Sequence, residues 1–215
     1  MQRKTQIVML AVLVCGLMSG VASAEDVMLT QVTGQVSVSG SSGARPAVPL
    51  LKITDGDRLT LAADARVQMV YLGSGRQEIW KGTGQVDIGA TEGRSPSLRP
   101  ETTQLPGLIL RQLAKTPAVG DQVRRTGMVM VRGLDELEKI DRLEKDYAQF
   151  RALAPADDTT PEVFLLSSLF ELRDYATMRT VLADLKSKHG GQPAYDALIQ
   201  HFTKIVDEAS APPPR

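Results

Sequence analysis

Residues 52–72, which read KITDGDRLTLAADARVQMVYL, decide the fold of the N-terminal part of this chain. The segment Asp55-Gly56-Asp57 favours a turn, because glycine accepts a positive φ and the flanking carboxylates can accept backbone N–H bonds. A short strand follows this turn, and after a second turn the side chains alternate. One face of that second strand carries Ala65, Val67, Met69 and Tyr71. This period of two predicts a half-buried strand in an antiparallel sheet.

The neighbouring stretches continue the same pattern. Residues 28–39 alternate in the same way, and Gly34 within them indicates a bend or bulge. Gly73-Ser74-Gly75 predicts a hairpin turn into a strand that contains Trp80. The sequence therefore predicts an α+β protein, in which residues 25–89 form a small antiparallel β-sandwich or roll and a helical region of about four helices follows.

Four segments of this β-region carry a resemblance to a known family. They are Val32-Thr33-Gly34-Gln35-Val36, Gly56-Asp57-Arg58-Leu59-Thr60, Val70-Tyr71-Leu72 and Val86-Asp87-Ile88. Together they resemble a FecR-type domain, a small β-fold in exported or periplasmic parts of bacterial sensory and envelope proteins. The resemblance implies a binding or sensing role without catalytic residues. The founding members regulate a sigma factor from behind a transmembrane helix, and we do not expect that mechanism here, because the sequence shows no such helix.

Residues 1–24 are predicted to be a cleaved signal peptide. Arg3 and Lys4 form a basic start, an apolar core follows, and Ala22 and Ala24 mark a small-residue cleavage site. The apolar run of roughly 12 residues is shorter than the ~20 that a bilayer requires. Cys15 lacks the small preceding residue of a lipoprotein signal. We therefore expect cleavage after Ala24, a periplasmic location, and no membrane span in the mature protein.

The composition narrows the possible classes of function. The chain has 25 Lys and Arg residues against 25 Asp and Glu, without the dense basic patch that nucleic-acid binding requires. Its single cysteine lies in the predicted signal peptide. His189 and His201 have no partner at metal-ligand spacing. The sequence therefore predicts no cofactor, no metal site, no nucleic-acid partner and no enzymatic activity.

The second half of the chain divides into a linker and a helical region. Residues 90–133 are predicted to be a linker, rich in Gly, Ser, Thr and Pro at its start, with a short helix near 108–114 and a returning strand at 126–132. Residues 134–209 have apolar side chains at helical spacing, and 210–215 read as a disordered tail.

Two of the expected helices have distinct apolar patterns. The helix beginning near residue 134 has an apolar stripe that suits either packing on its own domain or a coiled-coil contact with another chain. The helix after Pro161 is apolar nearly all round and is expected to be central. The last three helices are similar in layout to a tetratricopeptide hairpin and its capping helix, although only one such unit is visible.

The candidate binding residues surround Trp80, the single tryptophan. The same hairpin offers Arg66, Gln68 and Gln77, and an aromatic plane beside amide and cationic donors suits sugar stacking or a protein contact. Alternatively, Trp80 belongs to the core.

Two hypotheses for the function follow from these features. The favoured one is a non-enzymatic, soluble periplasmic binding, sensing or adaptor protein. In this hypothesis the β-domain binds an envelope component and the helices dock a protein partner. The other hypothesis is a glycan- or peptidoglycan-binding module with purely structural helices.

Overall fold

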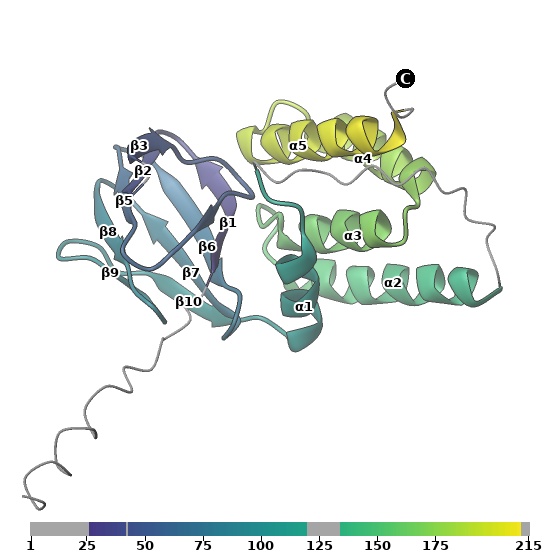
Figure 1. Ribbon diagram of the computed structural model, residues 1–215, viewed down its shortest axis with the longest axis horizontal. Helices are drawn as coiled ribbons and strands as arrows, with labels where there is room; N and C mark the ends of the chain where they lie inside the picture. Colours follow the sequence, from purple (N-terminus) through teal and green to yellow (C-terminus); the bar gives the residue numbers. More distant parts are fainter. Residues whose placement is uncertain (1–25, 42, 120–133, 212–215) are drawn as a thin grey trace, which may run out of the picture.

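The computed structural model describes residues 26–41, 43–119 and 134–211. Over these ranges the chain forms two five-stranded antiparallel sheets followed by five helices (Figure 1). The predicted α+β class, with a β-rich N-terminal part and a helical C-terminal region, is therefore confirmed. The predicted signal peptide, with Ala22 and Ala24, and the strand expected at 126–132 lie outside the described residues.

The ten strands divide between two sheets. Sheet A has the order β10-β7-β6-β1-β4. Its strands are β1 (Val27–Thr33), β4 (Lys52–Ile53), β6 (Arg66–Tyr71), β7 (Arg76–Lys81) and β10 (Glu101–Gln104). Sheet B has the order β3-β2-β5-β8-β9. Its strands are β2 (Val36–Gly40), β3 (Gly43–Pro46), β5 (Arg58–Leu61), β8 (Gly84–Ile88) and β9 (Gly93–Arg94).

The predicted hairpin after residue 72 connects β6 to β7. Gly75 has a φ of 76°, a conformation that glycine adopts without steric cost, and its N–H donates to Tyr71 O at 2.8 Å. This turn brings Val67 opposite Trp80 in the register of β6 and β7. Residues opposite each other in an antiparallel pair point to the same face of the sheet. Both side chains belong to the cluster of buried residues between the two sheets, which we call the sandwich core.

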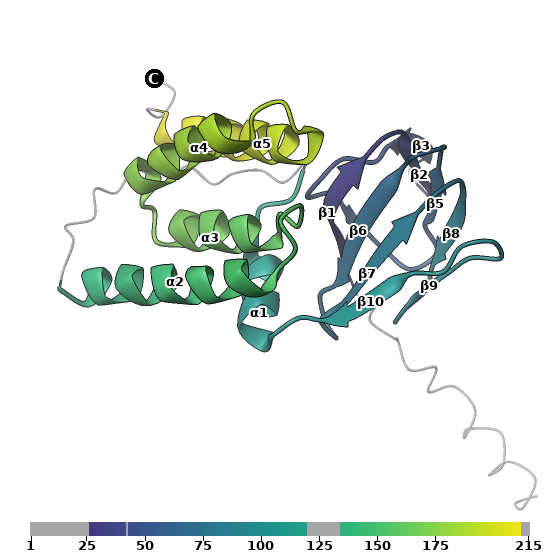
Figure 2. The ribbon, with the colours of Figure 1, turned by 180° about the vertical axis from the view of Figure 1, so that it is seen from behind.

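The helices cover the other face of sheet A, as two opposite views show (Figures 1 and 2). The helices are α1 (Gly107–Lys115), α2 (Leu134–Leu153), α3 (Thr160–Glu171), α4 (Tyr175–His189) and α5 (Pro193–Ser210). A second buried cluster, which we call the helix cluster, joins residues of all five helices to Met28, Leu50 and Val70 of the β-region. Within the described ranges, no helix combines the length and apolar character of a membrane crossing.

Neighbouring residues of the β-region enter different clusters. Met69 belongs to the sandwich core and Val70 to the helix cluster, because successive side chains of a strand point to opposite faces. Leu50 and Leu51 divide in the same way. Leu50 has a φ of 63°, which is uncommon for a residue with a β-carbon. Its N–H donates to Leu29 O at 2.6 Å, and its C=O accepts from Val119 N at 3.0 Å. These two bonds hold Leu50 where its side chain enters the helix cluster.

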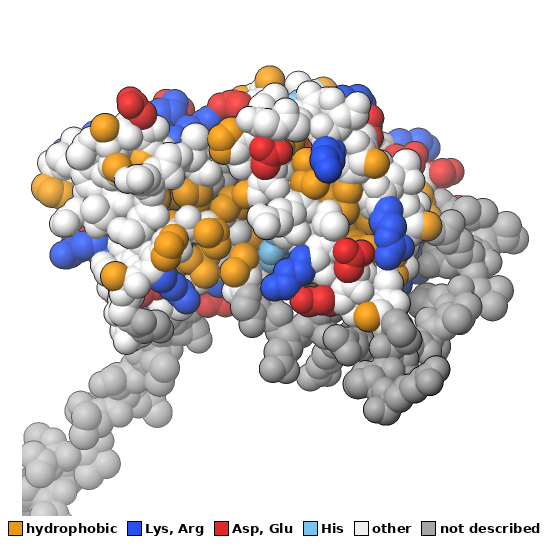
Figure 3. All heavy atoms as spheres, turned by 90° about the horizontal axis from the view of Figure 1, so that it is seen from above, with side chains coloured by type: hydrophobic (Ala, Val, Ile, Leu, Met, Phe, Trp, Pro, Cys, Tyr) orange, Lys and Arg blue, Asp and Glu red, His pale blue; other side chains and the backbone are white. Residues whose placement is uncertain are grey.

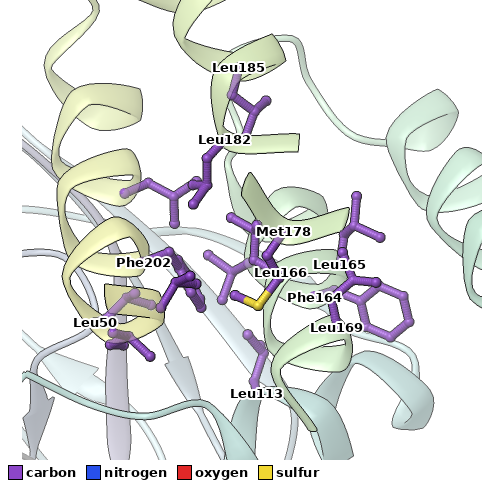
Figure 4. Packing of buried hydrophobic residues seen from close by; sticks show 14 of the residues in the cluster. Leu50, Leu113, Phe164, Leu165, Leu166, Leu169, Met178, Leu182, Leu185 and Phe202 are labelled. Atoms are coloured by element: carbon purple, nitrogen blue, oxygen red, sulfur yellow. The ribbon is translucent and has the colours of Figure 1, made fainter. Parts of the chain in front are cut away.

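Helix α3 is central, as its apolar pattern predicted. Every residue from Thr160 to Leu169 is buried, and the side chains of α3 meet those of α4 and α5 in the helix cluster (Figure 4). Helix α2 packs against α3 through its apolar stripe. Leu143 is buried there, and the ring of Phe150 lies edge-on to Phe164 with the centroids 5.1 Å apart. The stripe of α2 therefore packs on its own chain, as the first of the two interpretations expected.

Candidate functional site

Trp80 does not form a binding platform on the surface. Its side chain is only 1% exposed and lies in the sandwich core, where the indole Nε1 donates to Glu78 Oε2 at 3.0 Å. The alternative of a core tryptophan is therefore correct, and the exposed alternative is wrong. The sequence already indicated that Trp80 and Gln77 cannot belong to one binding surface. Gln77 and Trp80 are three positions apart on one strand, so their side chains must point to opposite faces.

The predicted polar residues Arg66 and Gln68 lie on the face of sheet A that the helices cover. The side chain of Gln68 is fully buried, and its Nε2 donates to Asp158 Oδ1 at 2.8 Å and to Thr160 Oγ1 at 2.9 Å. Arg66 Nη1 donates to Asp157 Oδ2. This guanidinium lowers the pKa of the Asp157 carboxyl, chiefly through the hydrogen bond. Both residues therefore bind the connection between α2 and α3.

Gln77 also contacts its own chain. It is 3% exposed, and its Oε1 accepts a hydrogen bond from Thr103 Oγ1 of β10 at 3.0 Å. Gln77 therefore ties β7 to the edge strand of sheet A. The prediction that these polar groups face a ligand is corrected, because segments distant in the sequence cover them.

The contacts of Arg66 and Gln68 with the α2–α3 connection form one polar cluster. A second polar cluster, of Tyr147, Arg151 and Glu162, holds the same connection from the helix side. Glu162 is 2% exposed, and Arg151 Nη1 donates to both of its carboxylate oxygens, at 3.1 and 3.0 Å. Tyr147 OH donates to Glu162 Oε1 at 3.1 Å. Burial, followed by the nearby Glu162 charge, raises the pKa of Tyr147. Arg151 Nη1 also donates to Asp158 O at 2.7 Å, so one guanidinium links both polar clusters.

We expect Gln68 and Asp158 to be energetically coupled. A double-mutant cycle with Gln68→Ala and Asp158→Ala should give a coupling energy of about 0.5–3 kcal/mol in urea unfolding, because each change removes one hydrogen bond from the other buried group and leaves that group only its bond to Thr160. The same cycle with Lys188→Ala and Asp184→Ala is the control, since that pair is exposed and lies one helical turn apart. Additive effects at Gln68 and Asp158 would contradict a direct contact between these two side chains.

Among the described residues, no group of three or more His, Cys, Asp or Glu side chains is arranged to hold a metal ion. The two histidines contact other parts of the helical region. The His189 ring stacks on Tyr195 with the centroids 4.1 Å apart, and His201 Nε2 lies 3.0 Å from Pro117 O. These contacts connect α5 to the end of α4 and to the segment after α1.

A groove between α4 and α5 remains as a candidate site. Two adjoining hollows of about 260 and 600 Å³ share Lys186, Ile199, Thr203 and Asp207 among their lining residues. The smaller hollow also reaches the apolar side chains of Leu182 and Val206. We call these two hollows the α4–α5 groove. Sequence reasoning did not identify it, although Ile199 shares a face of α5 with the polar residues Asp196 and Thr203, one turn away on either side, and this was a possible signal.

The groove has an apolar floor and charged borders. Figure 3 looks onto this side of the molecule and shows hydrophobic side chains between Lys or Arg and Asp or Glu side chains. Helix α4 contributes Arg179 and Lys186 to the lining. Helix α5 contributes Asp196 and Asp207, together with Glu208 and Lys204. The border on α4 is therefore basic, and the border on α5 carries a net negative charge.

A third hollow lies on sheet B. It measures about 620 Å³ and is lined by both apolar and polar residues of β2, β3 and β5 and their adjoining loops, among them Gln35, Val36, Arg45 and Leu61. None of its lining residues is aromatic.

No protein-family model, curated protein or solved structure matches the chain.

Proposed function

We propose that this protein is a non-enzymatic periplasmic adaptor that docks a protein partner in the α4–α5 groove. One observation carries the proposal: Leu182, Ile199 and Val206 line a groove whose borders hold exposed charges of both signs. A binding groove typically combines an apolar lining with a few polar groups that fix orientation. The predicted signal peptide and the resemblance to FecR-type domains support the cell envelope as the location.

The surface chemistry favours a protein partner over a glycan. Sugar recognition commonly uses an exposed aromatic plane, and Trp80, the residue best suited to that role, lies in the core. The large hydrophobic side chains exposed in the described part of the chain are Val48, Leu108, Val119 and Leu153, none of them aromatic. The hollow on sheet B also lacks an aromatic lining residue.

The β-sandwich would support the helices and keep one sheet face for an envelope component. Its sheet A face is covered by the helices, whereas the outer positions of sheet B, such as Ser37, Thr60, Gln85 and Asp87, are exposed. Because Met28, Leu50 and Val70 enter the helix cluster, the sandwich and the helices would move together as one scaffold.

The experiment uses the mature protein as bait in an envelope extract, beside two variants. Thr203→Arg places a long cationic side chain over the groove at an exposed position, and Leu153→Arg does the same on α2, where the side chain is 86% exposed. We expect Thr203→Arg to lose at least one partner that the parent and Leu153→Arg both retain. Thermal melting of both variants checks that they are folded.

Two outcomes would contradict the proposal. One is that Thr203→Arg retains every protein that the parent retains. The other is that the mature protein sediments with purified cell wall and captures no protein that depends on the groove, which would favour the glycan-binding alternative.

A further inference from the structure

We propose that the occupant of the α4–α5 groove is an amphipathic helix of the partner protein. Acidic side chains would follow its border along α4, and basic side chains its border along α5. This inference rests on the proposed protein-docking function and adds the chemistry of the segment that is bound.

The groove suits a helix better than an extended segment. Its walls are two α-helices, whose interior N–H and C=O groups are already bonded within each helix. An extended segment over the apolar floor would therefore leave its own backbone groups without partners, whereas a helix satisfies them internally. The lining of the groove on α5 includes Asp196 and Asp207, eleven residues apart, a rise of about 16 Å, with Ile199 between them as the partly exposed apolar side chain. That length accommodates apolar side chains at positions i, i+3 or i+4, and i+7 of a bound helix.

The charges on the two borders differ in sign. Lys186 on the α4 border has no ion pair within the described residues. Arg179 Nη2 lies 3.9 Å from Asp207 Oδ1, and their side chains are 52% and 68% exposed. Such an exposed pair contributes little to stability, so either member can pair with a bound segment instead. On α5, Asp196 adds a further carboxylate to the acidic border.

Borders of opposite sign favour one direction of the bound helix. When the acidic side of the ligand lies along Lys186, its basic side lies along Asp207. Reversing the helix would place like charges together, and like-charge contacts discriminate strongly against a wrong orientation. A helix with two acidic or two basic borders can match only one wall of the groove.

The test uses three labelled synthetic helical peptides and the full mature chain. The peptides share one apolar stripe and differ only in the residues beside it: Glu on one side and Lys on the other, Glu on both sides, or Lys on both sides. We expect the mixed peptide to bind about tenfold more tightly than either uniform peptide, measured by fluorescence anisotropy at low salt, because two or three border pairs add their small contributions.

Charge reversal on α4 tests the assignment of the borders. Lys186→Glu should weaken the mixed peptide and strengthen the Lys-only peptide, so that their order reverses. Lys188→Glu is the matched control, because it changes the net charge equally on the same helix but lies outside the lining of the groove. This control should preserve the preference for the mixed peptide.

The outcomes separate the two proposals. If all three peptides bind equally, or if Lys186→Glu behaves like Lys188→Glu, the charge assignment is wrong. The docking groove itself is then tested by Thr203→Arg, which should weaken all three peptides when they bind in the groove. If none of the peptides binds the parent protein, both the helical ligand and the docking groove are overturned.

Discussion

Replacing Trp80 by alanine should lower the free energy of unfolding by roughly 3–5 kcal/mol. The side chain is the largest of those fully buried in the described structure, and it packs between the two sheets. The substitution would leave a cavity that the flanking strands of the sandwich can fill only in part. It would also remove the indole N–H that donates to Glu78, a carboxylate with no exposed surface. Urea unfolding followed by far-UV circular dichroism measures the loss.

A graded comparison tests how much of this loss depends on the volume of the side chain. Trp80→Phe keeps one aromatic ring but loses the N–H donor and part of the indole volume, so we expect a smaller loss of about 1–3 kcal/mol. Lys81→Ala, the next residue along β7, should change stability by no more than about 1 kcal/mol, because its ion pair with Glu101 is exposed. A Trp80→Ala variant that unfolds at the same urea concentration as the parent would show that this ring is not a core residue.

Leu113→Ala should destabilise the sandwich and the helices together, by about 2–5 kcal/mol. Leu113 is fully buried on α1 and belongs to the helix cluster (Figure 4). The same cluster contains Val70 of sheet A. The single tryptophan reports on the sandwich core, and far-UV circular dichroism reports mainly on the helices. Because the helix cluster spans both parts, we expect both signals to change in one transition, in the parent and in the variant.

The control for this experiment is Leu153→Ala on α2, whose side chain is 86% exposed. This substitution should leave the unfolding midpoint unchanged in both the tryptophan signal and the circular dichroism signal. If the helical signal of Leu113→Ala melted well before its tryptophan signal, the two parts would be separate folding units. The domain boundary predicted at residue 134 would then also be a boundary in stability.

Local sequence patterns identified many of the individual elements, but not β9 and β10, which lie within the predicted linker 90–133. The strand predicted at 28–39 is divided near Gly34 into β1 and β2, which belong to different sheets. Gly75 marked the β6–β7 hairpin, because a positive φ costs glycine nothing. The apolar run after Pro161 predicted a central helix, and α3 is buried from Thr160 to Leu169. Turn formation, strand alternation and helix periodicity depend on residues only a few positions apart, so they can be read along the chain.

The burial of both faces of sheet A was harder to infer. Alternation in β6 suggested one face in contact with solvent, yet Val70 on that face packs into the helix cluster. The continuous apolar run Met69-Val70-Tyr71 is typical of a strand buried on both sides and was the available signal. The same period of two, applied to Gln77 and Trp80, would have separated the proposed binding residues into two faces.

Tertiary structure alone decided which surfaces are available for binding. Gln68 meets Asp158 across 90 positions of sequence, and no local pattern specifies that pair. The α4–α5 groove likewise depends on how two helices pack, because its floor takes Leu182 from one and Ile199 from the other. Propensity and periodicity act over a few residues, so they assign each side chain to a face of its own element. Whether that face is then covered depends on which distant segment packs against it, and that is settled only when the whole chain buries its apolar surface.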